Sequence, residues 1–284
     1  MRIASIGGSI VLTIFREQMA RKRICWVMRA SLGQRRSARL HRRGGTALAI
    51  GLAALVLTGM NPPGPTRNTS PIAGLGWHLK FHDEFVGKTL NGTKWSTTFP
   101  WGARTIASNN ELEYYTDNAL NVAKGVLRIR ADRRRVGEYA YTSGMINSHK
   151  SFASTYGYYE IKAKVPKGKG LWTAFWLAPQ DQTSPPEIDV LEVLGDRTTT
   201  LSMTNHFMGA SGATQAIGGS WNGPDFSKAF HTFGIMWNPA QITWYVDGVA
   251  RFSTGNGIPS KPMYVIANLA VGGDLPGSPD AMTR

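Results

Sequence analysis

The sequence predicts an all-β protein built as a sandwich of two antiparallel sheets. From Trp77 onward, short apolar segments alternate with turns rich in Gly, Pro, Asn and Asp. Several segments alternate apolar and polar residues with period two, and β-branched and aromatic residues are common in them. No long stretch shows helical periodicity. A chain of 284 residues is long enough for one large domain with a sizeable core.

The predicted strands follow one another at short intervals, with sequences such as VAKGVLRIRA, YGYYEIKAKV and MYVIANLA. The dipeptide Asp247-Gly248 separates ITWYV from VARF, and this pair favours a tight hairpin turn. Many short strands without an internal repeat are typical of a two-sheet sandwich. The main strands are expected at residues 122–131, 156–165, 171–177, 187–193, 231–237, 241–246 and 263–270.

The segment before this domain has the features of a leader. Residues 46–60, TALAIGLAALVLTGM, form an apolar run that follows a cluster of arginines. The run has the length of a signal-peptide core and is shorter than the roughly 20 residues of a transmembrane helix. We therefore expect a basic leader at 1–60, with a signal peptide around 28–60, and a Pro-rich linker at 61–74. An uncleaved anchor is the alternative, because no clean cleavage site follows; either implies a secreted or extracytoplasmic domain.

The net charge of +14 does not predict a nucleic-acid partner. Residues 1–66 hold 11 of the Lys and Arg residues against a single acid, Glu17, whereas residues 67–284 hold 21 against 17 acids. The basic excess therefore belongs to the leader, and a mildly basic, solvated surface describes the rest. The only cysteine, Cys25, also lies in the leader, so the domain has no disulfide and no cysteine metal site.

One segment, Glu187-Ile188-Asp189-Val190-Leu191-Glu192, carries three carboxylates. Side chains alternate between the faces of a strand, so Glu187 and Asp189 point the same way and Glu192 the opposite way. One extra residue, a β-bulge at Val190-Leu191, would return Glu192 to the side of the other two. The sequence thus predicts a row of three acids on one face of one strand.

Such a row suits the hydrolysis of a glycosidic bond. One carboxylate attacks, one carboxylic acid protonates the leaving oxygen, and a neighbour tunes them. Crowded carboxylates raise the pKa of at least one member and titrate as a unit, which keeps a general acid protonated. Three other interpretations stay open: a carbohydrate-binding protein without turnover, a transglycosylase, and a calcium site, although calcium prefers ligands from loops.

Two kinds of side chain near the acids have both a functional and a structural interpretation. Trp172 and Trp176 lie four residues apart, on one face of a regular strand. Indole faces stack on sugar rings, but tryptophan in a sandwich also belongs to the core. His206, in the segment Thr204-Asn205-His206-Phe207, is by itself an ordinary hydrogen-bonded strand histidine.

The acidic segment resembles the active-site strand of glycoside hydrolase family 16, in the bulged form of its laminarinase-like members. Further segments resemble that family in its order, and together they cover about residues 75–280. These segments are WHLKFHDEF (77–85), NNELEYYT (109–116), SGMINS (143–148), YGYYEIKAKVP (156–166), GLWTAFWL (170–177), FHTFGIMW (230–237), ITWYVDG (242–248) and NLAVGG (268–273).

The resemblance implies a concanavalin-like β-jelly-roll sandwich whose concave sheet forms a glycan cleft, within a catalytic domain at 75–284. Glu187 would be the nucleophile, Glu192 the acid/base, and Asp189 a hydrogen-bond partner of the nucleophile. The implied enzyme is a secreted, endo-acting retaining β-glycanase on a β-1,3 or mixed β-1,3/1,4 glucan or a related exopolysaccharide. The residues expected to bind substrate are Asn110, Trp172, Trp176 and His206.

Two departures from the family pattern are visible. Met145 stands where the family usually has a basic residue, and the chain ends at Arg284, before the family's last strand. We therefore expect a sandwich that is short at its C-terminus. Family members often hold a structural calcium whose site uses that segment, so no metal and no cofactor are expected here. The expected partner is a polysaccharide; a monomer without nucleic-acid partner or stable membrane span is expected.

Overall fold

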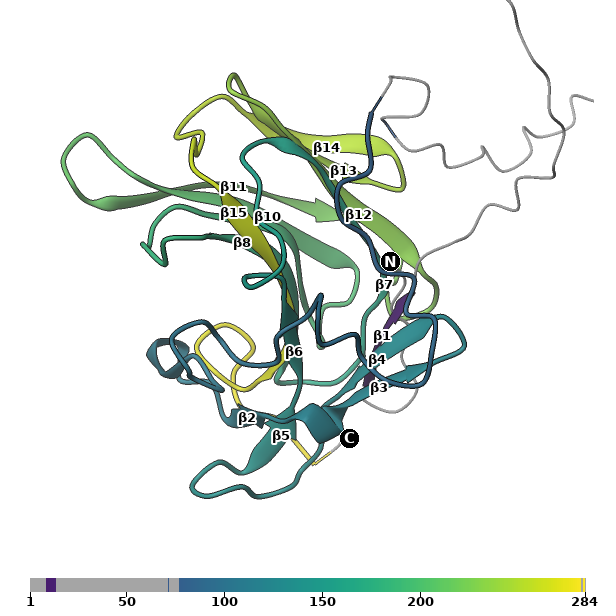
Figure 1. Ribbon diagram of the computed structural model, residues 1–284. Helices are drawn as coiled ribbons and strands as arrows, with labels where there is room; N and C mark the ends of the chain where they lie inside the picture. The colour runs from purple at the N-terminus through teal and green to yellow at the C-terminus, as the bar shows by residue number, and fades with distance from the viewer. Residues whose placement is uncertain (1–8, 14–70, 72–76, 282, 284) are drawn as a thin grey trace, which may run out of the picture. The chain divides into compact units, whose positions relative to one another are not determined.

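The computed structural model describes residues 9–13, 71, 77–281 and 283, and it shows two antiparallel sheets packed face to face (Figure 1). The prediction of an all-β sandwich is therefore confirmed. Besides the strands, the described residues contain only two short 3-10 helices, η1 (Ala107–Asn109) and η2 (Asp117–Ala119). Most of the predicted leader, including residues 28–60, lies outside the described residues.

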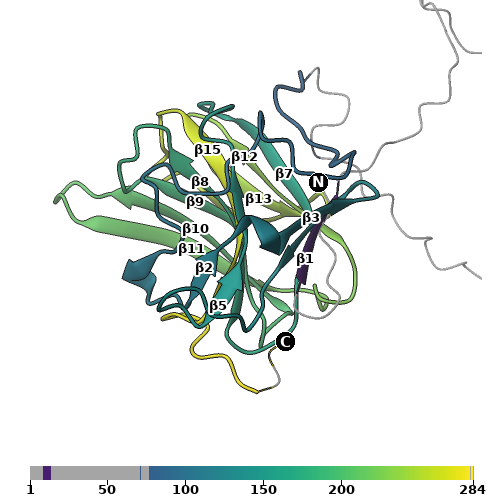
Figure 2. The ribbon, with the colours of Figure 1, turned by 60° about the horizontal axis from the view of Figure 1, so that its bottom comes forward.

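The six-stranded sheet contains the acidic segment. Its order is β11 (Thr214–Asn222), β10 (Thr200–Met208), β9 (Glu187–Leu194), β8 (Leu171–Pro179), β15 (Met263–Val271) and β6 (Met145–Asn147). Figure 2 shows β11, β10, β9, β8 and β15 side by side, with β12, β13 and β7 in the second layer. A small parallel pair, β2 (Glu113–Tyr115) with β5 (Tyr141–Ser143), completes the fold.

The seven-stranded sheet forms the other layer of the sandwich. Its order is β14 (Val249–Thr254), β13 (Ile242–Val246), β12 (His231–Trp237), β7 (Gly157–Lys164), β1 (Ser9–Thr13), β4 (Val126–Arg130) and β3 (Leu120–Ala123). Sequence analysis did not anticipate β1, because its five residues fall in the expected leader. Strand β1 pairs antiparallel with β4 on one side and with β7 on the other, and it therefore connects these two strands within the sheet.

Turn chemistry explains where the strands end. The turn at Asp247-Gly248 has positive φ at both residues, 50° and 77°, as the hairpin prediction requires. The predicted single strand at 122–131 was wrong: Lys124 and Gly125 also have positive φ, 53° and 73°, and split it into the hairpin β3–β4. Strands β10 and β11 were not predicted, because the polar Asn205 interrupts the apolar alternation of β10 and two glycines interrupt that of β11.

The core fills the space between the two sheets. Trp237 and Trp244 are its largest fully buried side chains, 1% and 0% exposed. From β9, the core takes Ile188, Val190, Leu191 and Val193. A second, smaller cluster lies on the other side of the six-stranded sheet and includes Met145, which is 1% exposed. Met145, where the resemblance led us to expect a basic residue, is therefore a buried apolar side chain.

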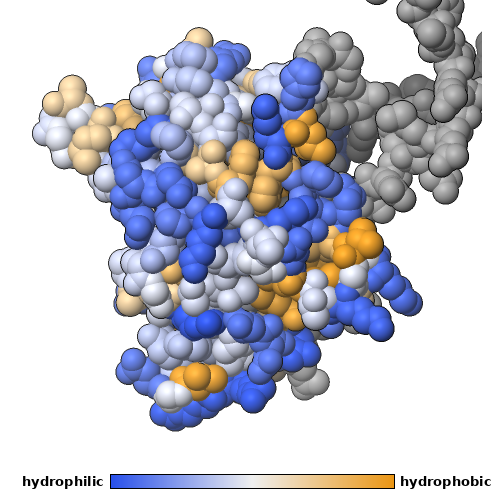
Figure 3. Space-filling view, in the orientation of Figure 1, coloured by the Kyte–Doolittle hydropathy of each residue, from blue (hydrophilic) through white to orange (hydrophobic). Residues whose placement is uncertain are grey.

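Figure 3 shows the hydropathy of one face of the described residues. On the face shown in Figure 3, hydrophilic residues predominate and apolar residues form separate patches. Within the part of the chain that the structure describes, no helix has the length and apolar character needed to cross a membrane.

Candidate active site

The bulge that the sequence predicted is present in β9. Asp189 pairs with Thr204 on β10 and with Trp176 on β8, but the registers of both pairings shift after it. Pairing resumes further along β9, with Glu192 opposite Ser202. Because Val190 has no matched residue on either neighbouring strand, the side-chain alternation is reset there.

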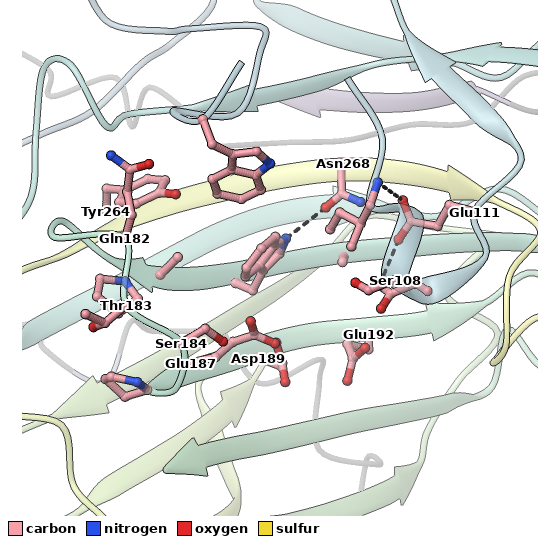
Figure 4. A pocket seen from close by; sticks show the side chains of 18 of the residues that line it. Ser108, Glu111, Gln182, Thr183, Ser184, Glu187, Asp189, Glu192, Tyr264 and Asn268 are labelled. Carbon is pink, nitrogen blue, oxygen red and sulfur yellow. Dashed lines mark hydrogen bonds between the residues drawn. The ribbon is translucent and has the colours of Figure 1, made fainter. Parts of the chain in front are cut away.

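The reset places the three acids on the same face. Glu187, Asp189 and Glu192 all line a cleft of about 410 Å³ on the six-stranded sheet. Figure 4 shows them in a row along β9, with Gln182 and Thr183 on the Glu187 side. The structure thus brings together the three residues that the sequence singled out.

His206 also lies in this group. It is opposite Glu187 in the pairing of β10 with β9, and its Nε2 is 3.0 Å from Oδ2 of Asp189. The same nitrogen is 4.0 Å from Oε1 of Glu187. The histidine therefore contacts the acids, and the interpretation as an isolated strand histidine does not describe its surroundings.

Burial dominates the electrostatics of the row. It raises the pKa of Glu187 well above its usual value, and the charge of Asp189 adds to the effect. Burial also raises the pKa of Asp189 well above its usual value, followed by the charge of Glu192. For Glu192, burial raises the pKa, while His206 and a hydrogen bond from Trp172 act against it. The expected elevation is present, but loss of hydration contributes more than like-charge repulsion.

The two tryptophans of β8 differ in their contacts. Trp172 and Trp176 both line the cleft, as their spacing predicted. Trp172 is partly exposed and donates its indole N–H to Oε1 of Glu192 at 3.1 Å. Trp176 is 8% exposed and donates to Oδ1 of Asn268 at 2.9 Å. Trp172 therefore touches the acid row directly, whereas Trp176 belongs to the wall of the cleft.

The hydrogen bond of Asn110 lies away from the acid row. Asn110 does not line the cleft; its Nδ2 donates to Oδ1 of Asp274 at 2.8 Å and so links the 106–112 segment to the one after β15. Sequence reasoning missed Trp101, which lines the cleft, is 53% exposed and stacks on Phe99 with ring centroids 4.6 Å apart. The Phe-Pro-Trp-Gly turn around Trp101 was the available signal, because a turn exposes its side chains.

Three of these side chains also offer metal-binding atoms. Glu187, Asp189 and His206 each present one ligand atom, and these atoms lie within 4.8 Å of one another. Their hydrogen bond already uses Nε2 of His206 and Oδ2 of Asp189. Calcium prefers six to eight oxygen ligands, mainly from loops, so an imidazole and two strand carboxylates are a poor calcium site.

The fold and this cleft together define a carbohydrate-active β-sandwich with a carboxylate centre. The sequence matches the family described as glycosyl hydrolases family 16 over residues 96–283, about two thirds of the chain. The chain belongs to that family.

Relatives and solved structures agree with this assignment. The chain is 38% identical over 222 residues to the endo-1,3-1,4-beta-glycanase ExsH of Rhizobium meliloti (strain 1021), a match that covers 70% of the chain and 47% of the relative. It is 32% identical over 245 residues to the glucan endo-1,3-beta-glucosidase A1 of Niallia circulans, covering 71% of the chain and 35% of that protein. The chain thus spans less than half the length of these relatives.

A similar fold is seen in the laminarinase catalytic domain from Thermotoga maritima MSB8. The TM-score is 0.66 at 33% identity, and the match covers 73% of this chain and 92% of that one. The endo-beta-1,3-glucanase from Pyrococcus furiosus gives 0.63 at 35% identity, covering 73% and 89%. The likeness extends over nearly the whole of these solved structures.

Proposed function

We propose that this protein is an endo-acting, retaining β-glycanase that hydrolyses a β-1,3 or mixed β-1,3/1,4 glucan, or a related exopolysaccharide. The observation that carries the proposal is the bulge in β9, which places Glu187, Asp189 and Glu192 together in the cleft. The endo mode and the β-glucan substrate are supported by the names of the relatives, two of which are called endo-1,3-1,4-beta-glycanases.

In the proposed reaction, Glu187 attacks the anomeric carbon while Glu192 protonates the departing glycosidic oxygen. The bond from carbon to the leaving sugar breaks as the bond to the Glu187 carboxylate forms. Water, deprotonated by Glu192 acting as a base, then attacks the glycosyl-enzyme and releases the sugar with its original anomeric configuration.

The acid row needs one shared proton between Glu187 and Asp189. We place it on Asp189, because this side chain is 6% exposed, whereas that of Glu187 is 33% exposed and better solvated as an anion. In this proposal Asp189 carries the proton that the two carboxyl groups share, while its Oδ2 contacts Nε2 of His206 at 3.0 Å. Glu192 keeps its own proton because burial raises its pKa, as a general acid requires.

The first test is Glu187→Gln, which removes the nucleophile but keeps the shape of the side chain. Release of reducing ends from a soluble β-glucan should fall on the order of 10⁴-fold, with an unchanged melting temperature. Glu138→Gln, the same change at an exposed position, serves as the control. Near-normal turnover of Glu187→Gln would exclude Glu187 as the nucleophile.

The second test identifies substrate and stereochemistry. A panel of polysaccharides scored for reducing ends should show cleavage of β-1,3 or mixed-linkage glucans, and NMR of the first product should show a retained anomer. An inverted anomer would contradict the mechanism. Longer products from an oligosaccharide would indicate a transglycosylase, and binding without new reducing ends would indicate a carbohydrate-binding protein.

We extend the proposal to location and partners. The apolar run at 46–60 after a basic segment supports export, through a cleaved signal peptide or an uncleaved anchor. The proposed partner is the polysaccharide itself, bound by a monomer. Fractionation of cells that express the full chain, followed by mass determination of the N-terminus, would test this.

A further inference from the structure

The bulge in β9 is contacted from the opposite sheet by one tryptophan. The indole Nε1–H of Trp244, on β13, donates to the backbone oxygen of Asp189 at 2.7 Å. Trp244 is 0% exposed, so this hydrogen bond crosses the core between the sheets. It joins the floor of the cleft to a side chain that never meets substrate.

The bonded peptide group is the one at which the strand becomes irregular. Asp189 is matched with residues on both neighbouring strands, but the following Val190 is matched on neither. A bulge disrupts the regular ladder, and a buried carbonyl there needs a donor. An indole can only donate, and its N–H has a fixed direction in the ring. Trp244 therefore favours one orientation of the Asp189–Val190 peptide group.

This orientation decides where the third acid points. Glu192 follows Glu187 by five residues, an odd number, so in a regular strand it would face the core. With the bulge, Glu192 lines the cleft beside Glu187 and Asp189. Any local change that relaxes the bulge moves the proton donor relative to the nucleophile, and displacements of about 1 Å lower catalytic rates by about 10²-fold.

We propose that Trp244 is a positioning residue for the acid row: its hydrogen bond to Asp189 holds the bulge that presents Glu192 to the leaving group. Trp244 acts through the backbone of β9 and touches no reacting atom. The kinetic test of this role measures the hydrolysis of β-glucan and therefore rests on the proposed function.

The chain offers a matched control for simple core packing. Trp237 lies on β12, next to β13 in the same sheet, and is 1% exposed. Its Nε1–H also donates to a backbone oxygen, that of Pro259, at 3.1 Å, but Pro259 is outside the six-stranded sheet. The same substitution at the two positions therefore removes the same kind of buried bond, and only one of them involves β9.

The experiment compares Trp244→Phe with Trp237→Phe in the full chain. Both should lower the melting temperature by a few degrees. Trp244→Phe should lower kcat on soluble β-glucan by about 10- to 100-fold with KM within about threefold, whereas Trp237→Phe should change kcat less than about threefold. If either variant fails to fold, 3-benzothienylalanine at the same position replaces only the N–H by sulfur and keeps both rings.

A second readout needs no substrate. The ¹³C carboxyl titration of Glu192, assigned with Glu192→Gln, should shift by about 0.5 pH unit or more in Trp244→Phe and stay fixed in Trp237→Phe. A wild-type protein that cleaves no β-glucan would refute the proposed function, while this titration would still test the positioning role. Equal kcat values for the two variants, with an unmoved Glu192 titration, would overturn the role of Trp244.

Discussion

The molecule contains two clusters of acids with the same spacing and different surroundings. Glu187 and Asp189 are two residues apart in β9, and Glu111 and Glu113 are two residues apart at the start of β2. The Glu187 side chain is 33% exposed to the cleft, whereas Glu113 is 0% exposed. Glu111 also lines the cleft, but it is only 7% exposed and Glu113 is fully buried, so the second pair presents far less of its carboxylates to a substrate.

The hydrogen bonds of the second pair show what it does. Oε2 of Glu113 accepts the backbone N–H of Val271 at 2.7 Å, at the end of β15. Glu111 accepts from Asn109 Nδ2 at 2.9 Å and from the backbone N–H of Ile106 at 3.3 Å. These bonds hold the loop beside the cleft. Acid spacing in a sequence therefore does not separate a reactive pair from a structural one; the exposure and the hydrogen-bond partners of each carboxylate do.

The largest expected effect is the loss of turnover when the proton donor of the β9 cluster is removed. Glu192→Gln should lower turnover of β-glucan by about 10³-fold, because general acid catalysis contributes 10²–10⁴-fold. The melting temperature should hardly change, since a partly exposed carboxyl is replaced by an amide of the same shape. Turnover assays and a thermal melt check both statements. Turnover within tenfold of wild type would place the proton donor elsewhere.

The corresponding change in the buried pair should affect stability instead. Glu113→Leu leaves the buried N–H of Val271 without its acceptor, which costs about 1–3 kcal/mol. The melting temperature should fall by about 2–12 °C, at 2–4 °C for each kcal/mol in a domain of this size. Turnover at 25 °C should change less than about tenfold. A loss of turnover as large as that of Glu192→Gln would show that Glu113 also contributes to catalysis and is not only structural.

A smaller effect sharpens the assignment of Glu192 as the acid. The Trp172 N–H favours the Glu192 carboxylate and lowers its pKa, so Trp172→Phe should raise that pKa. The alkaline limb of the kcat/KM profile, which reports loss of the protonated acid, should move up by about 0.5 pH unit. Trp176→Phe is the control, because the Trp176 N–H bonds to Asn268 and not to an acid. If the alkaline limb of the kcat/KM profile lies at the same pH in both variants, Glu192 is not the general acid.

The smallest expected effect concerns the pH dependence of stability. Burial, followed by the charge of Glu111, raises the pKa of Glu113 well above its usual 4.5, so the folded state holds a proton that the unfolded chain releases. Its contribution to stability is complete below pH 4.5 and is lost as the pH rises toward the folded pKa. Glu113→Gln removes this loss, so its melting temperature should gain about 2–4 °C on wild type between pH 5 and 8. If the melting temperatures of Glu113→Gln and wild type change with pH in the same way, Glu113 is ionised in the folded protein.

Much of the fold was readable because local signals were strong. The Asp247-Gly248 turn and the apolar strands around it follow from period and turn chemistry alone. The Lys124-Gly125 turn was missed because a lysine at positive φ gives a weaker signal than Asn or Asp. Strands β10 and β11 were missed because Asn205 interrupts the apolar alternation of β10, and Gly218 and Gly219 interrupt that of β11.

Part of the site could not be read in the same way. The acid row, the bulge and the Trp172/Trp176 spacing are local to one or two strands, so the sequence reveals them. Trp101 and the contact between Asn110 and Asp274 depend on how distant segments meet, 164 residues apart in the second case. Trp244 looked like any core tryptophan, because nothing in its own strand shows that its N–H reaches another sheet.

The sequence by itself determined the family, the strand pattern and the acids that can do chemistry, because these depend on residue type and short-range spacing. The tertiary structure alone decided which acids meet the cleft and which are buried, and which indole contacts the bulge. Exposure and cross-sheet hydrogen bonds are properties of packed segments, since they exist only when residues far apart in the chain exclude water from one another and from the backbone between them.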